Sequence, residues 1–383
     1  IGNMVQSSQQ NAPDQPRMPA MTTRPRTRRK SAPRTASGKL PIDLALQGGG
    51  SHGAFTWGVL DRLLEDETLE IAGISGTSAG AMNAVALAAG LMEGGREGAR
   101  AGLRRFWKRV AESSPFHALA AGPMGQLLGL GHPWLQAVVA PWQNLAQAVG
   151  SQFSPYQFNP LNLNPLRDIL TETVDFERVR ACNRTQLFVA ATHVATGDLR
   201  IFRQDELTAD MVLASACLPL LFQAVEIDGE AYWDGGYAGN PSLMPLITDS
   251  PAHDMLLVQI NPTQRETVPT STQEIADRIN EVTFNASLIK ELRTLALMKQ
   301  LIGDAPVKGS PELFRRVQQL RVHFIDGGTA LSDLGAGSKT NTQWAFLSRL
   351  HELGRDAAAR WLKQHRRDLG QRSSFDLNQV LQG

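Results

Sequence analysis

Three short motifs in the sequence contain residue types that acyl-transfer chemistry requires. The first is GTSAG, in which Gly76, Ser78 and Gly80 form the pattern GxSxG. A serine in this pattern lies on a sharp turn from a strand into a helix, where small neighbours leave its hydroxyl accessible. The N-terminus of the helix favours negative charge, which helps a nucleophile or an oxyanion. We therefore expect Ser78 to be a nucleophile on an elbow formed by Gly76, Ala79 and Gly80; a chance match is the alternative.

The second motif, QGGGSHG, places a glycine loop after an apolar run. Its glycines also match GxGxxG, the dinucleotide-binding pattern, but that function needs an acidic residue where the second strand ends, and Gly-Ile-Ser-Gly stands there. A plain tight turn is another alternative. Beside an elbow serine, the N–H groups of such a loop can stabilise the oxygen that becomes negative when serine attacks a carbonyl. The expected oxyanion donors are Gly48, Gly49, Gly50 and Gly53.

A serine nucleophile also needs a base, and the third motif, WDGG, supplies a candidate in Asp234. Asp234 ends a short aromatic strand and enters a glycine-rich turn, which presents its carboxylate from a fixed position. The alternative is an aspartate that only satisfies its own turn, as the similar FIDGG at Asp326 illustrates. His253 and His323 come late enough for a Ser-Asp-His order, but neither has a motif around it, so we expect both to be structural.

The elements around these motifs alternate along the chain. Residues 42–46 and 69–74 have strand character, residues 54–66 form an amphipathic helix pattern, and a helix rich in small residues starts near residue 79. This order predicts a parallel sheet that is covered on both faces. A right-handed crossover then places the glycine loop and the serine turn at the same edge of the sheet. Further strands are expected at 186–194, 199–203, 255–260 and 321–325, and further helices at 97–112, 208–216, 272–303 and 342–365.

QGGGSHG, GTSAG and WDGG in this order resemble the patatin-like phospholipase family, over roughly residues 42–260. The stretch SACLPLLF looks like the one that usually precedes the family's aspartate. The resemblance implies a three-layer α/β/α fold with a mostly parallel sheet. It also implies a Ser-Asp dyad of Ser78 and Asp234 without histidine, and an oxyanion loop formed by the glycines of the second motif.

Two features of the expected site bear on its chemistry. A free aspartate has a pKa of about 3.9 and is a weak base towards serine, so Asp234 needs burial to raise its pKa. The family usually carries Arg or Lys in the glycine loop where this chain has His52. A histidine there is expected to be partly charged near neutral pH, and so to influence lipid headgroup preference or the pH dependence of activity.

Composition adds expectations about partners. The 383 residues include 38 Lys plus Arg and 37 Asp plus Glu, a net charge of +1, which favours no charged partner; no nucleic acid is expected. Basic residues gather within residues 1–40 among Pro, Ser, Thr and Gln, so we expect a disordered basic tail. Such a tail can contact an anionic membrane surface, at about 1 kcal/mol per basic residue, and a solvated leader is the alternative.

We expect one catalytic domain over residues 41–370 and a C-terminal tail over 371–383. Residues 113–164 are apolar and interrupted by Gly and Pro. They are expected to form either a cap that meets lipid, with Trp134 and Trp142 as contacts, or ordinary core.

The location of the protein is inferred from two patterns. No uncharged apolar run reaches the roughly 18 residues that a membrane span needs, so none is expected. Cys182 and Cys217 stand in apolar surroundings without metal-ligand spacing, which is typical of reduced core thiols in a cytoplasmic protein.

The predicted function is therefore a serine lipid acyl hydrolase of the phospholipase A type, acting on phospholipids or related lipids without a metal or cofactor. A broad esterase or thioesterase on soluble or polymeric acyl esters is one alternative. A lipid-surface binding or regulatory protein with little turnover is the other.

Overall fold

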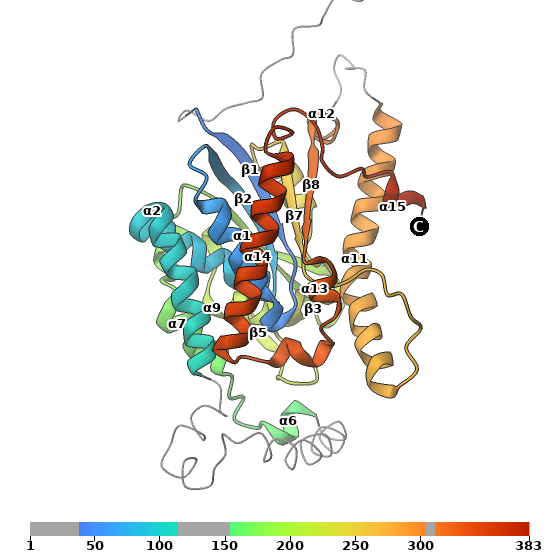
Figure 1. Ribbon diagram of the computed structural model, residues 1–383. Helices are drawn as coiled ribbons and strands as arrows, with labels where there is room; N and C mark the ends of the chain where they lie inside the picture. Colours follow the sequence, from blue (N-terminus) through green and yellow to red (C-terminus); the bar gives the residue numbers. More distant parts are fainter. Residues whose placement is uncertain (1–37, 114–153, 304–310, 383) are drawn as a thin grey trace, which may run out of the picture. The chain divides into compact units, whose positions relative to one another are not determined.

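The computed structural model describes residues 38–113, 154–303 and 311–382 (Figure 1). The expected basic tail and most of the apolar segment 113–164, including Trp134 and Trp142, lie outside these residues.

A central sheet organises the described chain. The strand order is β5-β6-β3-β2-β1-β7-β8, and β4 pairs with β3. β8, β7, β1, β2 and β3 run parallel to one another, whereas β4, β5 and β6 form antiparallel pairs. The strands are β1 (Leu40–Leu46), β2 (Leu69–Thr77), β3 (Gln186–His193), β4 (Leu199–Arg203), β5 (Val225–Ile227), β6 (Glu230–Asp234), β7 (Asp254–Gln259) and β8 (Arg321–Asp326). Every predicted strand is present, and the mostly parallel sheet is confirmed.

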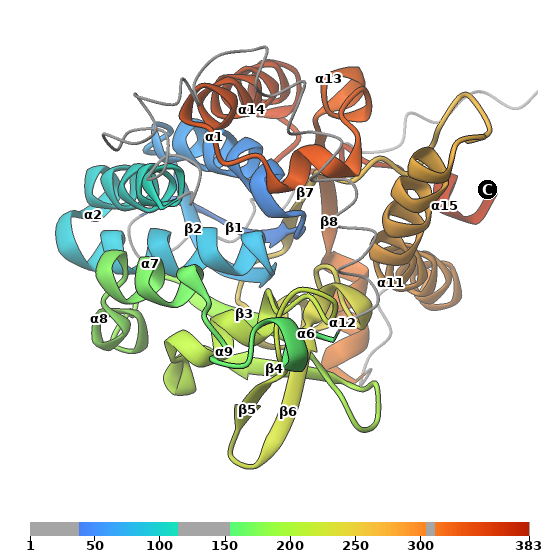
Figure 2. The ribbon, with the colours of Figure 1, turned by 90° about the horizontal axis from the view of Figure 1, so that it is seen from below.

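Helices cover both faces of the sheet, so the three-layer α/β/α prediction is confirmed (Figure 2). Alternate strand residues divide between two cores: Leu256 and Val258 belong to the core with α1, α2 and α14, while Met255 and Leu257 belong to the core with α10, α11 and α12. Because both faces are covered, β7 is buried along its whole length, which explains its continuous apolar sequence.

The longer helices are α1 (Gly53–Leu64), α2 (Ala79–Glu112), α7 (Pro165–Thr173), α11 (Thr272–Ile302), α12 (Glu312–Gln319) and α14 (Trp344–His365). The shorter ones are α6 (Pro155–Phe158), α8 (Phe176–Arg180), α9 (Ala209–Ser215), α10 (Met244–Asp249), α13 (Gly328–Ser332), α15 (Gln379–Gln382), η1 (Gly50–His52), η2 (Gln204–Glu206), η3 (Gly235–Tyr237) and η4 (Ala336–Thr340). α2 is interrupted at Gly94 and Gly95, whose backbone angles are not helical, in accord with a separate predicted helix over 97–112. Within the described ranges, no helix combines the length and the apolar character that crossing a bilayer requires.

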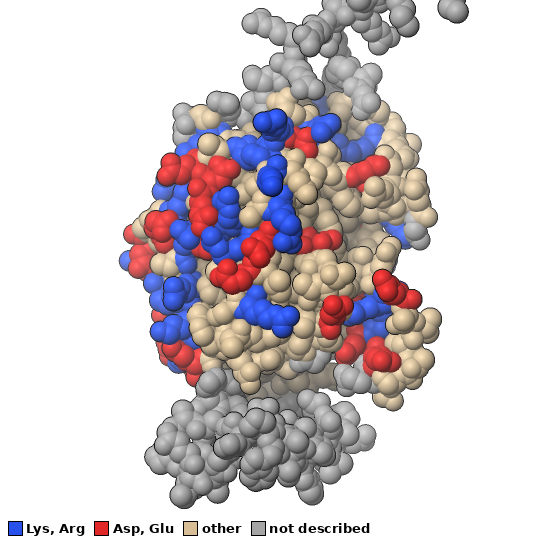
Figure 3. Space-filling model, in the orientation of Figure 1, with Lys and Arg blue, Asp and Glu red and all other residues tan. Residues whose placement is uncertain are grey.

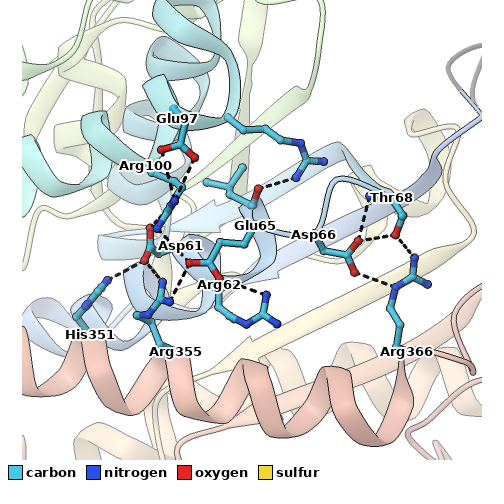
Figure 4. A network of polar contacts seen from close by, with 12 residues as sticks. Asp61, Arg62, Glu65, Asp66, Thr68, Glu97, Arg100, His351, Arg355 and Arg366 are labelled. Atoms are coloured by element: carbon cyan, nitrogen blue, oxygen red, sulfur yellow. Dashed lines mark hydrogen bonds and ion pairs between the residues drawn. The ribbon is translucent and has the colours of Figure 1, made fainter.

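α14 docks the C-terminal third of the chain onto α1. The two helices cross at Gly58 and Gly354, where an added Cβ would overlap with the backbone of the other helix at His351 and Phe55. A network of ion pairs adds to this contact between the helices (Figure 4). Asp61 on α1 binds Arg100 of α2 at 2.6 Å and also pairs with Arg355 of α14.

The same network extends along α1 and beyond its end. Glu65 pairs with both arginines, at 3.1 Å to Arg100 and 2.8 Å to Arg355, and Asp66 binds Arg366 at 2.9 Å. Charges of both signs are interspersed over the face that α14 and α2 form (Figure 3). The segment beyond the family-like motifs is therefore joined to the first two helices by close packing and by ion pairs.

Residues 371–382 also differ from the expected tail, because they pack on the domain. Leu377 is buried in the core that includes α11, and Phe375 stacks on Phe324 of β8 with ring centroids 5.2 Å apart. Arg293 of α11 donates a 2.8 Å hydrogen bond to the carbonyl of Val380. Apolar residues of the segment 371–382 thus cover one side of α11.

Candidate active site

Ser78 stands on a sharp turn between β2, which ends at Thr77, and α2, which begins at Ala79. Its backbone angles are φ 54° and ψ −121°, a conformation that costs a non-glycine residue of order 1–3 kcal/mol and is typical of functional turns. A Cβ on Gly76 would lie 2.7 Å from the backbone of Gly80, and one on Gly80 would overlap with the carbonyl of Leu46. Gly76 and Gly80 therefore have no room for a side chain at this turn.

The elbow is held by a contact that the sequence did not indicate. The N–H of Ser78 donates a 2.8 Å hydrogen bond to Oγ of Ser215, the last residue of α9. Ser215 is fully buried and opens the stretch SACLPLLF. Its side chain thus fixes the backbone of Ser78 from a segment 137 residues away.

Asp234 ends β6, and its carboxylate lines the same cavity as Ser78, whose hydroxyl lowers the pKa of the Asp234 carboxyl. Its carboxylate also accepts a 2.7 Å hydrogen bond from the N–H of Gly236. Only 1% of Asp234 is exposed, and burial raises the pKa of the carboxyl to about 7, against the lowering effects of the Gly236 hydrogen bond, of the Ser78 hydroxyl and of the charge of Lys339. Such a carboxylate is a much better base near neutral pH than a free aspartate.

Cys217 lies near this carboxylate but stays a thiol. Burial and the charge of Asp234 raise the pKa of the Cys217 thiol to about 12. The backbone carbonyl of Cys217 accepts a 2.8 Å hydrogen bond from the N–H of Asp234. Cys217 therefore positions the end of β6. Cys182 and Cys217 are both free and buried, as predicted.

The glycine loop lies against Ser78, and its N–H groups divide into two sets. The N–H of Gly48 donates to Oδ1 of Asn240 at 2.7 Å, and the N–H of Gly53 turns back to carbonyls of η1. These two groups, expected as oxyanion donors, therefore bind acceptors within the protein, because the loop must satisfy its own buried backbone. Gly49 and Gly50 line the cavity that contains Ser78.

Buried amide side chains fix this loop. Oε1 of Gln47 accepts hydrogen bonds from the N–H groups of Ile260 and Asn261, at 2.9 and 2.8 Å. The side chain of Asn261 donates to the carbonyl of Gly48 at 2.7 Å, and Gln47 donates to Asn285 at 2.8 Å. Motif matching assigned no role to these side chains, although Gln47 opens QGGGSHG, because they act through partners more than 200 positions away in the chain.

The expectation for His52 was wrong. Its side chain is 2% exposed and bonds Ser338 of η4, with Nε2 2.7 Å from Oγ. Burial, together with the charge of Lys339, lowers the pKa of His52 to about 4, so the ring is neutral at neutral pH. The ring points away from the cavity because η1 turns it toward η4 and Phe346.

The other candidates from the sequence lie elsewhere. Nε2 of His323 contacts Oδ1 of Asp254 at 3.0 Å, where β7 begins, and His253 immediately precedes that strand. Asp326 is exposed and accepts a hydrogen bond from the N–H of Gly328. None of these three candidates lines the cavity at Ser78.

The cavity has a volume of about 320 Å³ and contains both Ser78 and Asp234. It lies where the parallel strands end, on the side seen in Figure 2. Much of the wall is apolar: Met82, Phe106, Trp107, Val110, Leu166, Ala216, Leu218, Leu221, Phe222 and Phe284. The polar remainder includes Asn280, Lys339, Thr340 and Thr342, all from the C-terminal third. In the described part of the chain, no group of three or more His, Cys, Asp or Glu side chains is arranged to hold a metal ion.

No curated protein shows significant sequence similarity to the chain. A structure of VipD from Legionella pneumophila aligns with a TM-score of 0.39 and 17% identity, over 89% of this chain and 72% of that chain. A structure of full-length SpcU in complex with full-length ExoU, from the type III secretion system of Pseudomonas aeruginosa, aligns with a TM-score of 0.25 and 13% identity, over 90% of this chain and 76% of that chain.

Both TM-scores are below 0.5, so the assignment rests on a family match. The model of the patatin-like phospholipases matches residues 44–247, more than half of the 383 residues. This range includes the glycine loop, Ser78 and Asp234. The chain therefore belongs to the patatin-like phospholipase family and is a hydrolase that acts on ester bonds.

Proposed function

We propose that the chain is a serine lipid acyl hydrolase of the phospholipase A type, with Ser78 as nucleophile and Asp234 as base. The observation that carries this proposal is that both side chains line one largely apolar cavity, where the Ser78 hydroxyl is close enough to lower the pKa of the Asp234 carboxyl. As Oγ of Ser78 forms its bond to the ester carbonyl carbon, its proton passes to the carboxylate of Asp234. The tetrahedral intermediate then expels the alcohol, which takes the proton from Asp234.

The N–H groups of Gly49 and Gly50 stabilise the negative oxygen in this proposal. Both residues line the cavity beside Ser78, and Gly50 has a left-handed backbone (φ 58°) that few other residues adopt. Donors of this kind are each worth about 10²- to 10³-fold in rate. In the second half of the reaction, Asp234 activates a water molecule that hydrolyses the acyl-enzyme, and Ser78 regains its proton.

The apolar wall of the cavity favours binding of a long acyl chain. Side chains from α2, from α7 and from the segment after α9 form that wall, including Trp107, Leu166 and Leu221. Burying a methylene group contributes about 0.8 kcal/mol, so each added carbon that fits the cavity should raise affinity several-fold.

The test is a substrate panel of diacyl phospholipids and of soluble esters and thioesters with acyl chains of increasing length. The native protein should release long-chain fatty acid from the phospholipid, and Ser78→Ala should reduce that release by about 10³-fold or more. A preference for short soluble esters or thioesters would favour the broad esterase instead. Binding to lipid vesicles without hydrolysis by the native protein would favour the binding module.

A further inference from the structure

Lys339 reaches the cavity from a segment outside the family-like motifs. It lies in η4, which packs against η1 of the glycine loop. A Cβ on Gly50 would lie only 2.5 Å from the carbonyl oxygen of Lys339, and Ser338 holds His52 by the hydrogen bond described above. The backbone of η4 is thereby fixed against the loop that carries the proposed oxyanion donors, and the side chain of Lys339 lines the cavity.

The side chain of Lys339 is half-buried, and its ammonium group donates a hydrogen bond to a neutral amide. Its Nζ donates to Oδ1 of Asn280 at 2.7 Å and lies 5.8 Å from the centre of the Phe284 ring. The carboxylate of Glu281, whose charge also acts on Lys339, is engaged by Arg265 and Arg278.

An ammonium group has three N–H donors, and Asn280 occupies one of them. Burying a charge is costly unless it is paired and hydrogen-bonded, so an anionic group on a bound ligand would stabilise this ammonium group. Burial lowers the pKa of Lys339 to about 8, which still leaves most of the side chain charged at pH 7.

Most of the apolar wall comes from other elements than its polar part, although Phe284 of α11 is an apolar residue beside Lys339. Asn280 and Lys339 belong to α11 and η4, whereas Trp107 and Leu166 belong to α2 and α7. Figure 2 shows α11 on the opposite side of the strand ends from α2 and α7. An ester bound at Ser78 can thus place its acyl chain toward the apolar wall and its alcohol part toward Lys339.

We propose that Lys339 binds an anionic group on the alcohol part of the substrate, so that the enzyme selects acyl esters of a phosphorylated alcohol over uncharged esters. The inference rests on the proposed function and deepens it by naming the residue that recognises the substrate. Lys339 here is a specificity-determining residue that contacts the phosphate while Ser78 reacts with the ester.

Protonation of Lys339 provides a second readout. The charged groups that face it come from several elements: Asp234 of β6, Asp277 and Glu281 of α11, and Arg265 of the segment after β7. His52 of η1 is also close and is neutral. Because the cation is the acid form, the preference for a phosphorylated substrate should decrease as the pH rises through about 8. An arginine at the same position stays charged and should keep the preference.

The test compares kcat/KM for 1-acylglycerol 3-phosphate with that for 1-acylglycerol of the same acyl chain, both as monomers in solution. Both reactions use Asp234 as the base, so a change in its ionisation affects both kcat/KM values equally and leaves their ratio unchanged. Lys339→Met should lower the ratio by about 10-fold or more, and Lys339→Arg should preserve it. Lys290→Met is the matched control, because Lys290 is an exposed lysine of α11 that does not line the cavity.

Labelling by a neutral fluorophosphonate shows whether Lys339→Met keeps a reactive Ser78. Equal losses on both substrates would overturn the inference and assign Lys339 to the support of Asp234. An unchanged ratio, or inhibition by inorganic phosphate that persists in Lys339→Met, would also overturn it. If the native protein labels at Ser78 but hydrolyses neither ester, this inference fails; if it does not label at all, the proposed dyad fails.

Discussion

The N–H of Gly48 and Oδ1 of Asn240 lie 2.7 Å apart, and their hydrogen bond joins the glycine loop to the loop that follows Asp234. Asn240 is completely buried, and its amide nitrogen donates to the carbonyl of Phe284 on α11 at 3.0 Å. A single amide side chain therefore links three parts of the proposed site. Its two bonds connect residues 192 and 44 positions apart in the chain.

Replacement of Asn240 by Ala should weaken both stability and catalysis. It leaves the buried N–H of Gly48 without its acceptor and removes the bond to the carbonyl of Phe284, which should lower the free energy of unfolding by about 2 kcal/mol or more. The loosened loop should reduce kcat by about 10-fold or more, with a smaller effect on KM. Urea unfolding and ester hydrolysis measure the two effects. Asn183→Ala, at an exposed asparagine, is the control; native-like kcat in Asn240→Ala would show that the loop does not need this link.

The pH dependence of hydrolysis should report Asp234. Its carboxylate must be unprotonated to accept the proton of Ser78, and burial raises its pKa to about 7. For an uncharged ester, kcat/KM should therefore rise with pH and reach half of its plateau near pH 7. His52→Gln should leave that midpoint in place, because His52 is already neutral there. A midpoint near pH 4, or one that moves in His52→Gln, would contradict the assignment.

Asp234 should also reduce stability above acidic pH. Its pKa is raised in the folded state, so the folded protein binds this proton more tightly than the unfolded chain does. The resulting stabilisation is complete below the unfolded pKa of about 3.8 and is lost as the pH rises through about 7. Asp234→Asn removes this dependence.

The free energy of unfolding of Asp234→Asn, relative to the native protein, should thus increase between pH 4 and pH 7 by up to about 1.4 kcal/mol per pH unit and then level off. Urea unfolding at several pH values measures the difference. Asp326→Asn serves as the control, because Asp326 is an exposed aspartate that is likewise followed by two glycines. A pH-independent difference for Asp234→Asn would mean that its carboxyl titrates normally.

The parts of this site that local sequence could predict are those whose causes are local. Ser78 needs small neighbours on a tight strand-to-helix turn, and that requirement is visible within GTSAG. The alternation of strands and helices likewise predicted the sheet and its two covered faces. The Ser78 elbow was therefore expected from the chain alone.

Other parts depend on tertiary contacts that no local pattern encodes. His52 is neutral because Ser338, 286 residues further on, binds its ring in a buried place. Lys339 belongs to a stretch without any motif, and the docking of α14 on α1 brings that region to the glycine loop. The tail expected over 371–383 packs because Leu377 and its neighbours meet α11, an outcome decided by a surface far away in sequence.

The crossing of α1 and α14 should not tolerate a side chain. Ala at Gly58 would overlap with the backbone carbonyl of His351, and backbone cannot move as a side-chain tip can. Gly58→Ala should therefore lower the free energy of unfolding by about 1–3 kcal/mol, although alanine favours helix formation. Gly94→Ala is the control, because a Cβ there meets nothing within 4 Å. Equal or greater stability of Gly58→Ala in urea unfolding would contradict the observed crossing.

The most direct test of the central claim is covalent labelling by a fluorophosphonate, followed by mass spectrometry to locate the modified residue, with the fold of each variant checked by circular dichroism. The native protein should be labelled at Ser78. Ser78→Ala should not be labelled, Asp234→Asn should be labelled about 10²-fold or more slowly, and Asp326→Asn should be labelled at the native rate. Labelling at another serine, or a native rate in folded Asp234→Asn, would contradict the Ser78–Asp234 dyad.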